Sequence, residues 1–216
     1  MIRRFSTFLE NYKTQLSPEE MFLANIRNDI RNELERTGSM KEILSRTPPS
    51  LEYSIQEIHE LNKYTNISRE DIQFALHADV DEAGAYENFC RNKLKVNIQR
   101  SFFENIFKQT DPIVFYLKDY FNRKRPFELA NEFNIPFKVK IPISVNAQSY
   151  PGGHSLDSNI IKYVLTNLIP EKYKEIENFC SKMEFSRIYV GLHYPSDDII
   201  SRFVAQKIIE TGKLKY

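Results

Sequence analysis

The stretch Lys118-Asp-Tyr-Phe-Asn-Arg-Lys-Arg-Pro126 ends a predicted aromatic-rich helix and gathers several cations at that end. Lys118 and Arg125 are two helical turns apart, so they share a face if the helix persists that far. Pro126 disfavours α geometry at Arg125, which places this guanidinium at the helix end. An ammonium and a planar guanidinium together suit the non-equivalent oxygens of a tetrahedral anion. Taken alone, the cluster fits a solvated helix end better than a binding site.

Helical patterns dominate the chain on both sides of this stretch. A helix is predicted to start at Ser17-Pro18 and to end at Gly38. Within it, apolar residues recur every four positions, at Phe22, Ile26, Ile30 and Leu34. Ser68 is expected to cap a helix that continues to about Lys93, and Asp111-Pro112 to start another. Further helices are predicted over residues 96–107, 155–168, 171–190 and 195–211.

Between Phe127 and Tyr150 the helical pattern is lost. Apolar and polar residues alternate from Phe137 to Ile143, and prolines restrict such a segment to a sheet edge or a loop. The sequence therefore predicts an all-α fold, a helical bundle with one long extended loop. We expect a single domain over residues 1–216, with a helical N-terminal part (1–95) followed by the motif-bearing helices (96–216).

The overall composition points to a soluble cytoplasmic protein. Basic and acidic residues number 30 and 29, so no global field attracts nucleic acid or anionic lipid. No apolar run approaches the roughly 18 to 20 residues that cross a bilayer, and the N-terminus does not resemble a secretory signal. Cys90 and Cys180 are widely separated, which favours free thiols in a reducing compartment. We therefore expect no nucleic-acid partner and no integral membrane association.

A second cluster, Tyr150-Pro-Gly-Gly-His-Ser155, stands directly before an apolar helix. Gly152 and Gly153 let backbone N–H groups approach an anion closely, and the helix N-terminus favours negative charge there. His154 is then placed to give a proton to a leaving oxygen. In isolation, an ordinary turn with a histidine near a helix cap explains the segment equally well.

A third cluster combines Arg187 and His193 with the start of the last helix. Pro195 is a natural first helical residue, so Asp197 falls in the first turn. Its carboxylate is placed to accept a hydrogen bond from one imidazole nitrogen of His193, which leaves the other nitrogen free to attack. Alternatively, Asp197 and Asp198 only complement the helix dipole.

The three clusters read in order as Lys-x6-Arg-Pro, Pro-x-Gly-His and Ser-Arg-x5-His-x3-Asp. This order and spacing resembles the superfamily of type 2 phosphatidic acid phosphatases, class A bacterial acid phosphatases and vanadium haloperoxidases. The resemblance covers Lys118 to Asp197 and implies a phosphatase with the helical fold of that superfamily. It implies that phosphate is held by Lys118, Arg125, Gly152, Gly153 and Arg187, and that the catalytic residues are His154, His193 and Asp197.

In those roles, His193 is the nucleophile that becomes phosphohistidine, His154 the general acid and Asp197 the residue that orients His193. The reaction implied by the resemblance needs no metal, because the three cations supply the charge stabilisation. Gly152 departs from the usual pattern, in which a serine hydroxyl contacts phosphate. We therefore expect reduced but real activity.

Three functions remain open at this level. The first is metal-independent hydrolysis of a small phosphomonoester or diphosphate, and the second is a vanadium-dependent haloperoxidase, the only case that uses a cofactor (vanadate). The third, suggested by Gly152, is a phosphate-binding protein without turnover. Relatives also suggest a homodimer. The segment His77-Ala-Asp-Val-Asp-Glu82 holds possible metal ligands, but helical spacing spreads them around the axis, so we expect a solvated helix end and no metal site.

Overall fold

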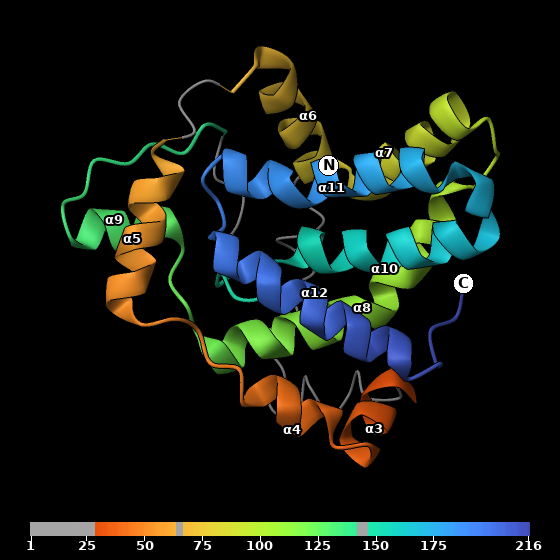
Figure 1. The fold of residues 1–216 in the computed structure, drawn as a ribbon, viewed down its shortest axis with the longest axis horizontal. Coiled ribbons are helices and arrows are strands. Elements are labelled where there is room, and N and C mark those ends of the chain that lie inside the picture. Colours follow the sequence, from red (N-terminus) through yellow and green to blue (C-terminus); the bar gives the residue numbers. More distant parts are fainter. Residues whose placement is uncertain (1–28, 64–66, 142–146) are drawn as a thin grey trace, which may run out of the picture.

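The computed structural model describes residues 29–63, 67–141 and 147–216. Within these ranges it contains helices and loops and no strand, which confirms the predicted all-α fold (Figure 1). The predicted start at Ser17-Pro18 and the first part of the apolar repeat lie outside the described residues.

Helices follow one another along both halves of the chain. The first half contains α3 (Asp29–Arg36), α4 (Ser39–Leu44), α5 (Leu51–Leu61), α6 (Arg69–Val80), α7 (Glu82–Phe89) and the π-helical turn η1 (Cys90–Leu94). The second half contains α8 (Arg100–Phe121), α9 (Pro126–Glu132), α10 (Gly153–Leu168), the short 3₁₀ turn η2 (Pro170–Lys172), α11 (Tyr173–Tyr189) and α12 (Pro195–Glu210).

The helix predicted from Ser68 to about Lys93 is broken into α6 and α7. Ser68 caps α6 as expected, because its Oγ accepts a hydrogen bond from the Asp71 N–H at 3.0 Å. Asp81 then leaves helical geometry (φ −150°, ψ 74°) and caps α7 by accepting from the Gly84 N–H at 3.0 Å. A carboxylate that competes for a backbone N–H thus ends one helix and begins the next.

In contrast, α8 is one continuous helix of 22 residues, and the predicted new start at Asp111-Pro112 is wrong. Pro112 lacks the N–H that would donate to the Lys108 carbonyl, and the helix continues through it without that hydrogen bond. Buried residues continue past the proline on the same face, at Phe103, Ile106, Ile113, Val114 and Leu117. Packing of this face against the core therefore outweighs the local cost of the proline.

The stretch after Lys118 is partly as predicted. Arg125 has extended backbone geometry (φ −73°, ψ 159°), and Pro126 then starts α9, a short helix in a region that we predicted to be extended. Residues 133–141 form an irregular connection, in agreement with the prediction. The rest of the predicted alternation, including Ile143, lies outside the described residues.

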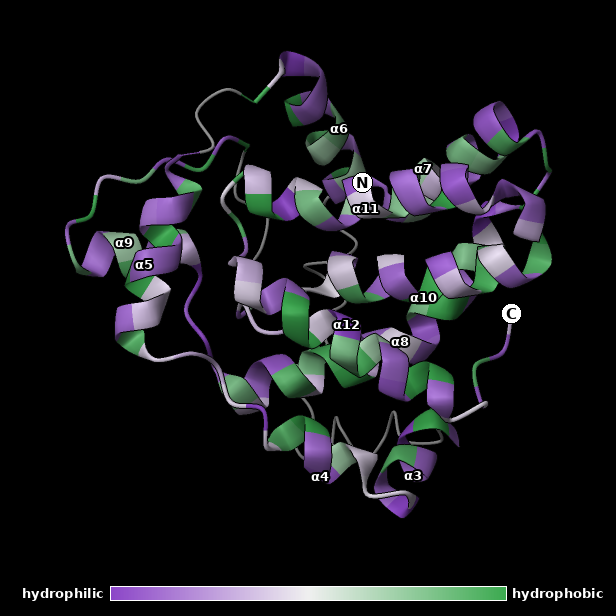
Figure 2. Ribbon diagram, viewed as in Figure 1, coloured by the Kyte–Doolittle hydropathy of each residue, from purple (hydrophilic) through white to green (hydrophobic). Residues whose placement is uncertain are grey.

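Helix α10 lies at the centre of the structure and packs against α11, α12 and α8 (Figure 1). Figure 2 shows apolar and polar bands alternating along the helices, as expected where one face of each helix packs inward. Fully buried residues of α10 include Leu156, Ile160, Ile161, Val164 and Leu165. This packing fixes the N-terminus of α10, which carries the second sequence cluster.

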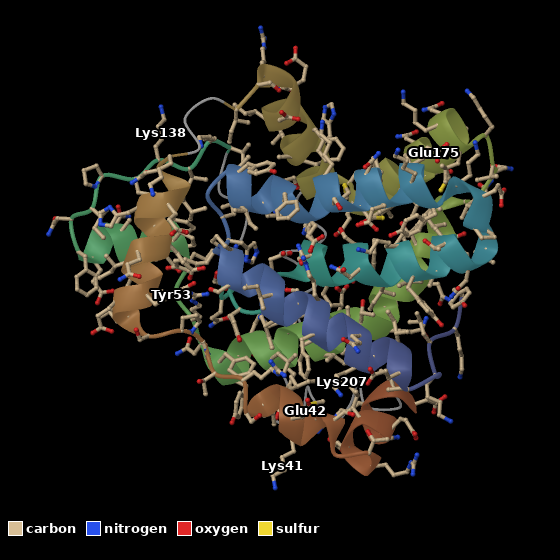
Figure 3. The ribbon with its side chains drawn as sticks, in the orientation of Figure 1. Lys41, Glu42, Tyr53, Lys138, Glu175 and Lys207 are labelled. Atoms are coloured by element: carbon tan, nitrogen blue, oxygen red, sulfur yellow. The ribbon has the colours of Figure 1, made fainter. Side chains whose placement is uncertain are left out.

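The remaining helices surround this centre. α3 and α4 pack against α12, where Lys207 Nζ lies 2.9 Å from Glu42 Oε2 (Figure 3). α5 packs against α9 on another side of the molecule (Figure 1). Cys90 and Cys180 are buried free thiols. Among the described helices, none combines the length and the apolar character that a bilayer-spanning helix needs.

Candidate active site

The structure brings the three sequence clusters together around the N-termini of α10 and α12. Lys118 comes from the last turn of α8, and Arg125 from the residue before α9. Arg187 comes from the end of α11. Gly152, Gly153 and His154 begin α10, while His193 and Asp197 stand before and within the first turn of α12. Helix ends thus supply all the predicted site residues, which is why their spacing along the chain is so irregular.

His193 and Asp197 form the predicted pair. His193 Nδ1 lies 2.9 Å from Asp197 Oδ2, and the carboxylate is fully buried. The same oxygen accepts hydrogen bonds from the Tyr194 N–H at 2.9 Å and from the Ser149 hydroxyl. Because a carboxylate can only accept, Nδ1 carries the imidazole proton and the lone pair of neutral His193 is on Nε2.

Arg125 lies directly against this lone pair. Its Nη1 is 3.2 Å from His193 Nε2 and donates to the Leu192 carbonyl at 2.9 Å. Its Nε donates to the Ala147 carbonyl at 2.7 Å, so carbonyls hold the guanidinium in place. Burial lowers the pKa of Arg125 to about 10, which still leaves it charged at neutral pH.

Lys118 is a second buried cation, and its ammonium donates to the Gln148 carbonyl at 2.6 Å and to the Ser149 carbonyl at 3.3 Å. Burial first, and then the charge of Arg125, lower the pKa of Lys118 well below its ordinary value. Cations that depress one another's pKa in this way gain free energy when an anion binds between them.

Arg187 provides the third cation. Its Nη2 lies 2.5 Å from Asp79 Oδ1, and both side chains are buried. Within the described part of the chain, its Nε and Nη1 are buried and have no hydrogen-bond partner. Arg187 lines a small cavity together with Gly152, Ser155, Glu184, Ile188, His193, Asp197 and Asp198. Two unsatisfied guanidinium N–H groups beside the His193 imidazole favour an oxygen-rich anionic ligand.

His154 stands in the first turn of α10. Its Nε2 lies 3.2 Å from the Ala78 carbonyl and 3.5 Å from Glu82 Oε2. Burial and then the charge of Arg187 lower its pKa to about 3, so the imidazole is neutral at physiological pH. The backbone N–H groups of the first turn have no acceptor within the helix, since the first intrahelical bond runs from the Leu156 N–H to the Gly152 carbonyl. This helix end therefore adds to the positive potential.

Sequence reasoning missed the role of the segment from His77 to Glu82. His77 is exposed, but Asp79 pairs with Arg187 and Glu82 contacts His154, so the prediction of a solvated helix end is wrong for these two carboxylates. The break at Asp81 separates their helices and directs both towards the site. The available signal was the pair of acids on either side of a helix-capping aspartate.

Gly152 leaves room for a side chain next to the candidate nucleophile. Its backbone is ordinary (φ −77°, ψ 117°), and its N–H donates to Ser201 Oγ at 2.9 Å. A Cβ at this position would lie 3.5 Å from Ser201 Oγ and 3.6 Å from His193 Nδ1, which are normal contacts. The serine of the usual motif would therefore fit here.

Comparison with known proteins supports the resemblance that the motifs indicated. Residues 105–209 match the sequence model of the PAP2 superfamily, and this range includes all the predicted site residues. The chain is also 31% identical over 87 residues to non-specific acid phosphatases of Salmonella typhimurium and Salmonella typhi. Each alignment covers 40% of this chain and 34% of the relative, about a third of its length. The resemblance predicted from the motifs is thus confirmed over the C-terminal part of the chain.

Gly152 and Gly191, which lies between α11 and α12, differ in the space available for a side chain, and this difference gives a first prediction. Gly152→Ser should change the free energy of unfolding by less than about 1 kcal/mol, because the new Cβ meets no close neighbour. Gly191→Ser should cost about 2 kcal/mol, because Gly191 has φ +84° and a Cβ there would lie 2.9 Å from Phe137 Cζ. Urea denaturation measures both losses, and equal losses would contradict the space described beside His193.

The buried imidazole of His193 predicts a pH-dependent stability. Burial, followed by the charge of Arg125, lowers its pKa well below the ordinary value, whereas the unfolded chain protonates it near pH 6.5. The unfolded state therefore binds more protons as pH falls from about 7 to about 5, and stability is lost in that direction by up to about 1.4 kcal/mol per pH unit.

His193→Gln removes this contribution and keeps the other ionisable groups. The free energy of unfolding of wild type minus that of the variant should therefore decrease as pH falls through this range. Urea titrations of both proteins at several pH values check this, and a difference that does not change with pH would show that His193 is not held neutral.

Proposed function

We propose that this chain, whose residues 105–209 match the PAP2 superfamily, is a phosphatase that hydrolyses small phosphorylated substrates through a phosphohistidine on His193. One observation carries the proposal: Asp197 holds Nδ1 of His193, while Nε2 keeps its lone pair beside Arg125, and Lys118 and Arg187 add positive charge near the same imidazole. A nucleophile, an orienting carboxylate and positive charge for three phosphate oxygens are what a phosphoryl transfer requires.

In the first step, the Nε2 lone pair attacks phosphorus in line with the leaving oxygen. The nitrogen–phosphorus bond forms as the bond to the leaving group breaks, and His154 gives that oxygen a proton. Lys118, Arg125 and Arg187 hold the non-bridging oxygens, whose charge they neutralise throughout the transfer. Asp197 continues to accept the hydrogen bond from the Nδ1–H of His193 and stabilises the positive charge that the imidazole acquires.

Substrate charge prepares His154 for this role. Its pKa is depressed to about 3 by burial and by Arg187, so the imidazole lacks the proton that a general acid needs. A phosphate dianion beside the three cations reverses their effect and raises this pKa, since a nearby anion favours the protonated form. Binding of the substrate therefore loads the acid with its proton.

In the second step, water attacks the phosphorus of the phosphohistidine. His154, now neutral after the first step, accepts a proton from this water, and the nitrogen–phosphorus bond breaks to release inorganic phosphate. The Nε2 lone pair of His193 is restored, so the cycle ends where it began. No step requires a metal ion, because the residues already named supply the positive charge.

The two histidines make separable predictions. His193→Ala should abolish phosphoenzyme formation and lower turnover by about three orders of magnitude or more. His154→Ala should still form phosphoenzyme from nitrophenyl phosphate, whose leaving group needs little protonation, but lose about 100- to 10,000-fold on an alkyl phosphate.

The measurement is acid-quench labelling and phosphate release in EDTA, with vanadate as inhibitor. Wild-type rates in His193→Ala would contradict the mechanism. Phosphate binding without turnover of any ester by the wild type would instead indicate a binding protein.

The missing hydroxyl at Gly152 gives a further prediction. Gly152→Ser places a donor beside the oxyanion site and should raise kcat on phosphate esters by about 100-fold, since one such donor contributes about 100- to 1,000-fold in rate. Gly152→Ala is the matched control, because it adds the same Cβ without the hydroxyl and should bring no gain. A fall in kcat with the serine variant would mean that glycine is itself an adaptation.

A further inference from the structure

Arg123 is a buried cation between two carboxylates, and it stands two residues before Arg125. Its side chain is 6% exposed, in contrast to the solvated helix end that the sequence suggested. Nη1 lies 2.7 Å from Asp197 Oδ1, and Nη2 lies 2.8 Å from Glu57 Oε2. The guanidinium thus contacts the oxygen of Asp197 that His193 leaves unused.

Glu57 extends this chain of contacts to the start of α12. Its Oε1 accepts from the Ser196 N–H at 2.7 Å, and its Oε2 accepts from the Ser196 hydroxyl at 2.7 Å. Glu57 is buried on α5 and lies outside the residues that match the superfamily. A helix remote in sequence therefore holds the backbone next to Asp197.

The plane of the guanidinium is fixed as well. The Arg123 side chain stacks on the ring of Tyr194 at 3.8 Å, and Tyr194 donates its own N–H to Asp197. Nη1 also donates to Ser196 Oγ and Nη2 to Ser54 Oγ, at 2.7 and 2.8 Å. A planar fork that satisfies four acceptors at once cannot be replaced by the point charge of a lysine.

We infer that Arg123 and Glu57 are positioning residues that set the orientation and the effective charge of Asp197, and through it the state of His193. The inference deepens the proposed function and rests on it for its kinetic part. Arg123 does not touch the nucleophile or the cavity beside it; it acts on the carboxylate from the far side.

The charge of Arg123 is needed because Asp197 is fully buried. Burial would raise the pKa of this carboxyl, but its hydrogen bond to His193 and the charge of Arg123 hold it below the usual range. Without Arg123, the negative charge of Asp197 acts on the imidazole alone and favours its protonation, which removes the attacking lone pair. Glu57 offsets part of the Arg123 charge, so its loss acts in the opposite direction.

Other charged groups also face His193 from the surrounding helices. They are Arg125, Lys118, Arg187, Glu184, Asp198 and Asp197 itself. All of them remain in variants at Arg123 and Glu57. A change in the pKa of His193 in those variants is therefore caused by the loss of Arg123 or Glu57.

The first readout is the titration of His193. NMR signals of the four histidines are recorded against pH, and the signal that is missing in His193→Gln is assigned to His193. Arg123→Gln should raise the pKa of His193 by about one unit, the order expected for loss of a nearby charge in a partly shielded site. Glu57→Gln should not raise it. Lys124→Gln removes a neighbouring but exposed charge and should leave the titration unchanged.

The second readout is the kinetics on nitrophenyl phosphate. Arg123→Gln should lower kcat about 10- to 100-fold with KM within about twofold, because a misplaced nucleophile slows chemistry more than binding. Arg123→Lys should keep the His193 titration near wild type, since the charge remains, and still lose about tenfold in kcat. Partial unfolding would also lower the apparent kcat at unchanged KM, so the His193 titration of the folded molecules is the readout that loss of stability alone does not move.

Because Arg123→Gln leaves Glu57 buried without its partner and is destabilised, the double variant Arg123→Gln/Glu57→Gln, which removes both charges, replaces it if the single variant does not fold. It should lose about tenfold in kcat. Wild-type kcat and wild-type titration in the folded variants would overturn the inference. The titration needs no turnover. A wild type that hydrolyses no ester would therefore refute the proposed function, and the NMR titration would still decide whether Arg123 and Glu57 set the state of His193.

Discussion

The buried carboxylate of Asp197 is the interaction on which the rest of the site depends. Four groups donate to it, from Arg123, His193, Tyr194 and Ser149, and they come from three separate parts of the chain. A carboxylate that is shielded from solvent requires such complete pairing, because an unpaired buried carboxylate would lower the stability of the fold by about several kcal/mol. Satisfying it therefore aligns the end of α8, the loop before α10 and the start of α12, and this alignment sets the tautomer of His193.

Around this centre, the protein accumulates positive charge that it compensates only in part. Arg187 has a carboxylate partner in Asp79, whereas Lys118 and Arg125 donate to backbone carbonyls, which carry only partial charge. Burial first, and then neighbouring cations, lower the pKa of both groups. A site built in this way favours a ligand of two or more negative charges over water, in agreement with the proposed phosphatase reaction.

The sequence alone missed α9, but it predicted the all-α fold, the non-helical backbone of Arg125 and the helix starts of α10 and α12. It succeeded there because proline, glycine and the 3.6-residue period act locally, as at Pro126 and Pro195. It failed where partners are distant. Glu57 and Arg123 are 66 positions apart, and no spacing rule connects them. The contacts of Asp79 and Glu82 with the site were missed because the sequence pattern predicted one continuous, solvated helix over this segment, and the break depends on the cap that Asp81 forms with Gly84.

The two helices α6 and α7 also bear on where this protein can be divided. Their carboxylates, together with Glu57 on α5, complete a site whose cations and histidines all lie within residues 105–209. The match to the superfamily therefore covers only part of the chain that contacts the candidate site. A transplanted segment that began at residue 105 would carry Arg187 without Asp79 and Arg123 without Glu57, and so would leave two buried guanidinium groups short of a counter-charge.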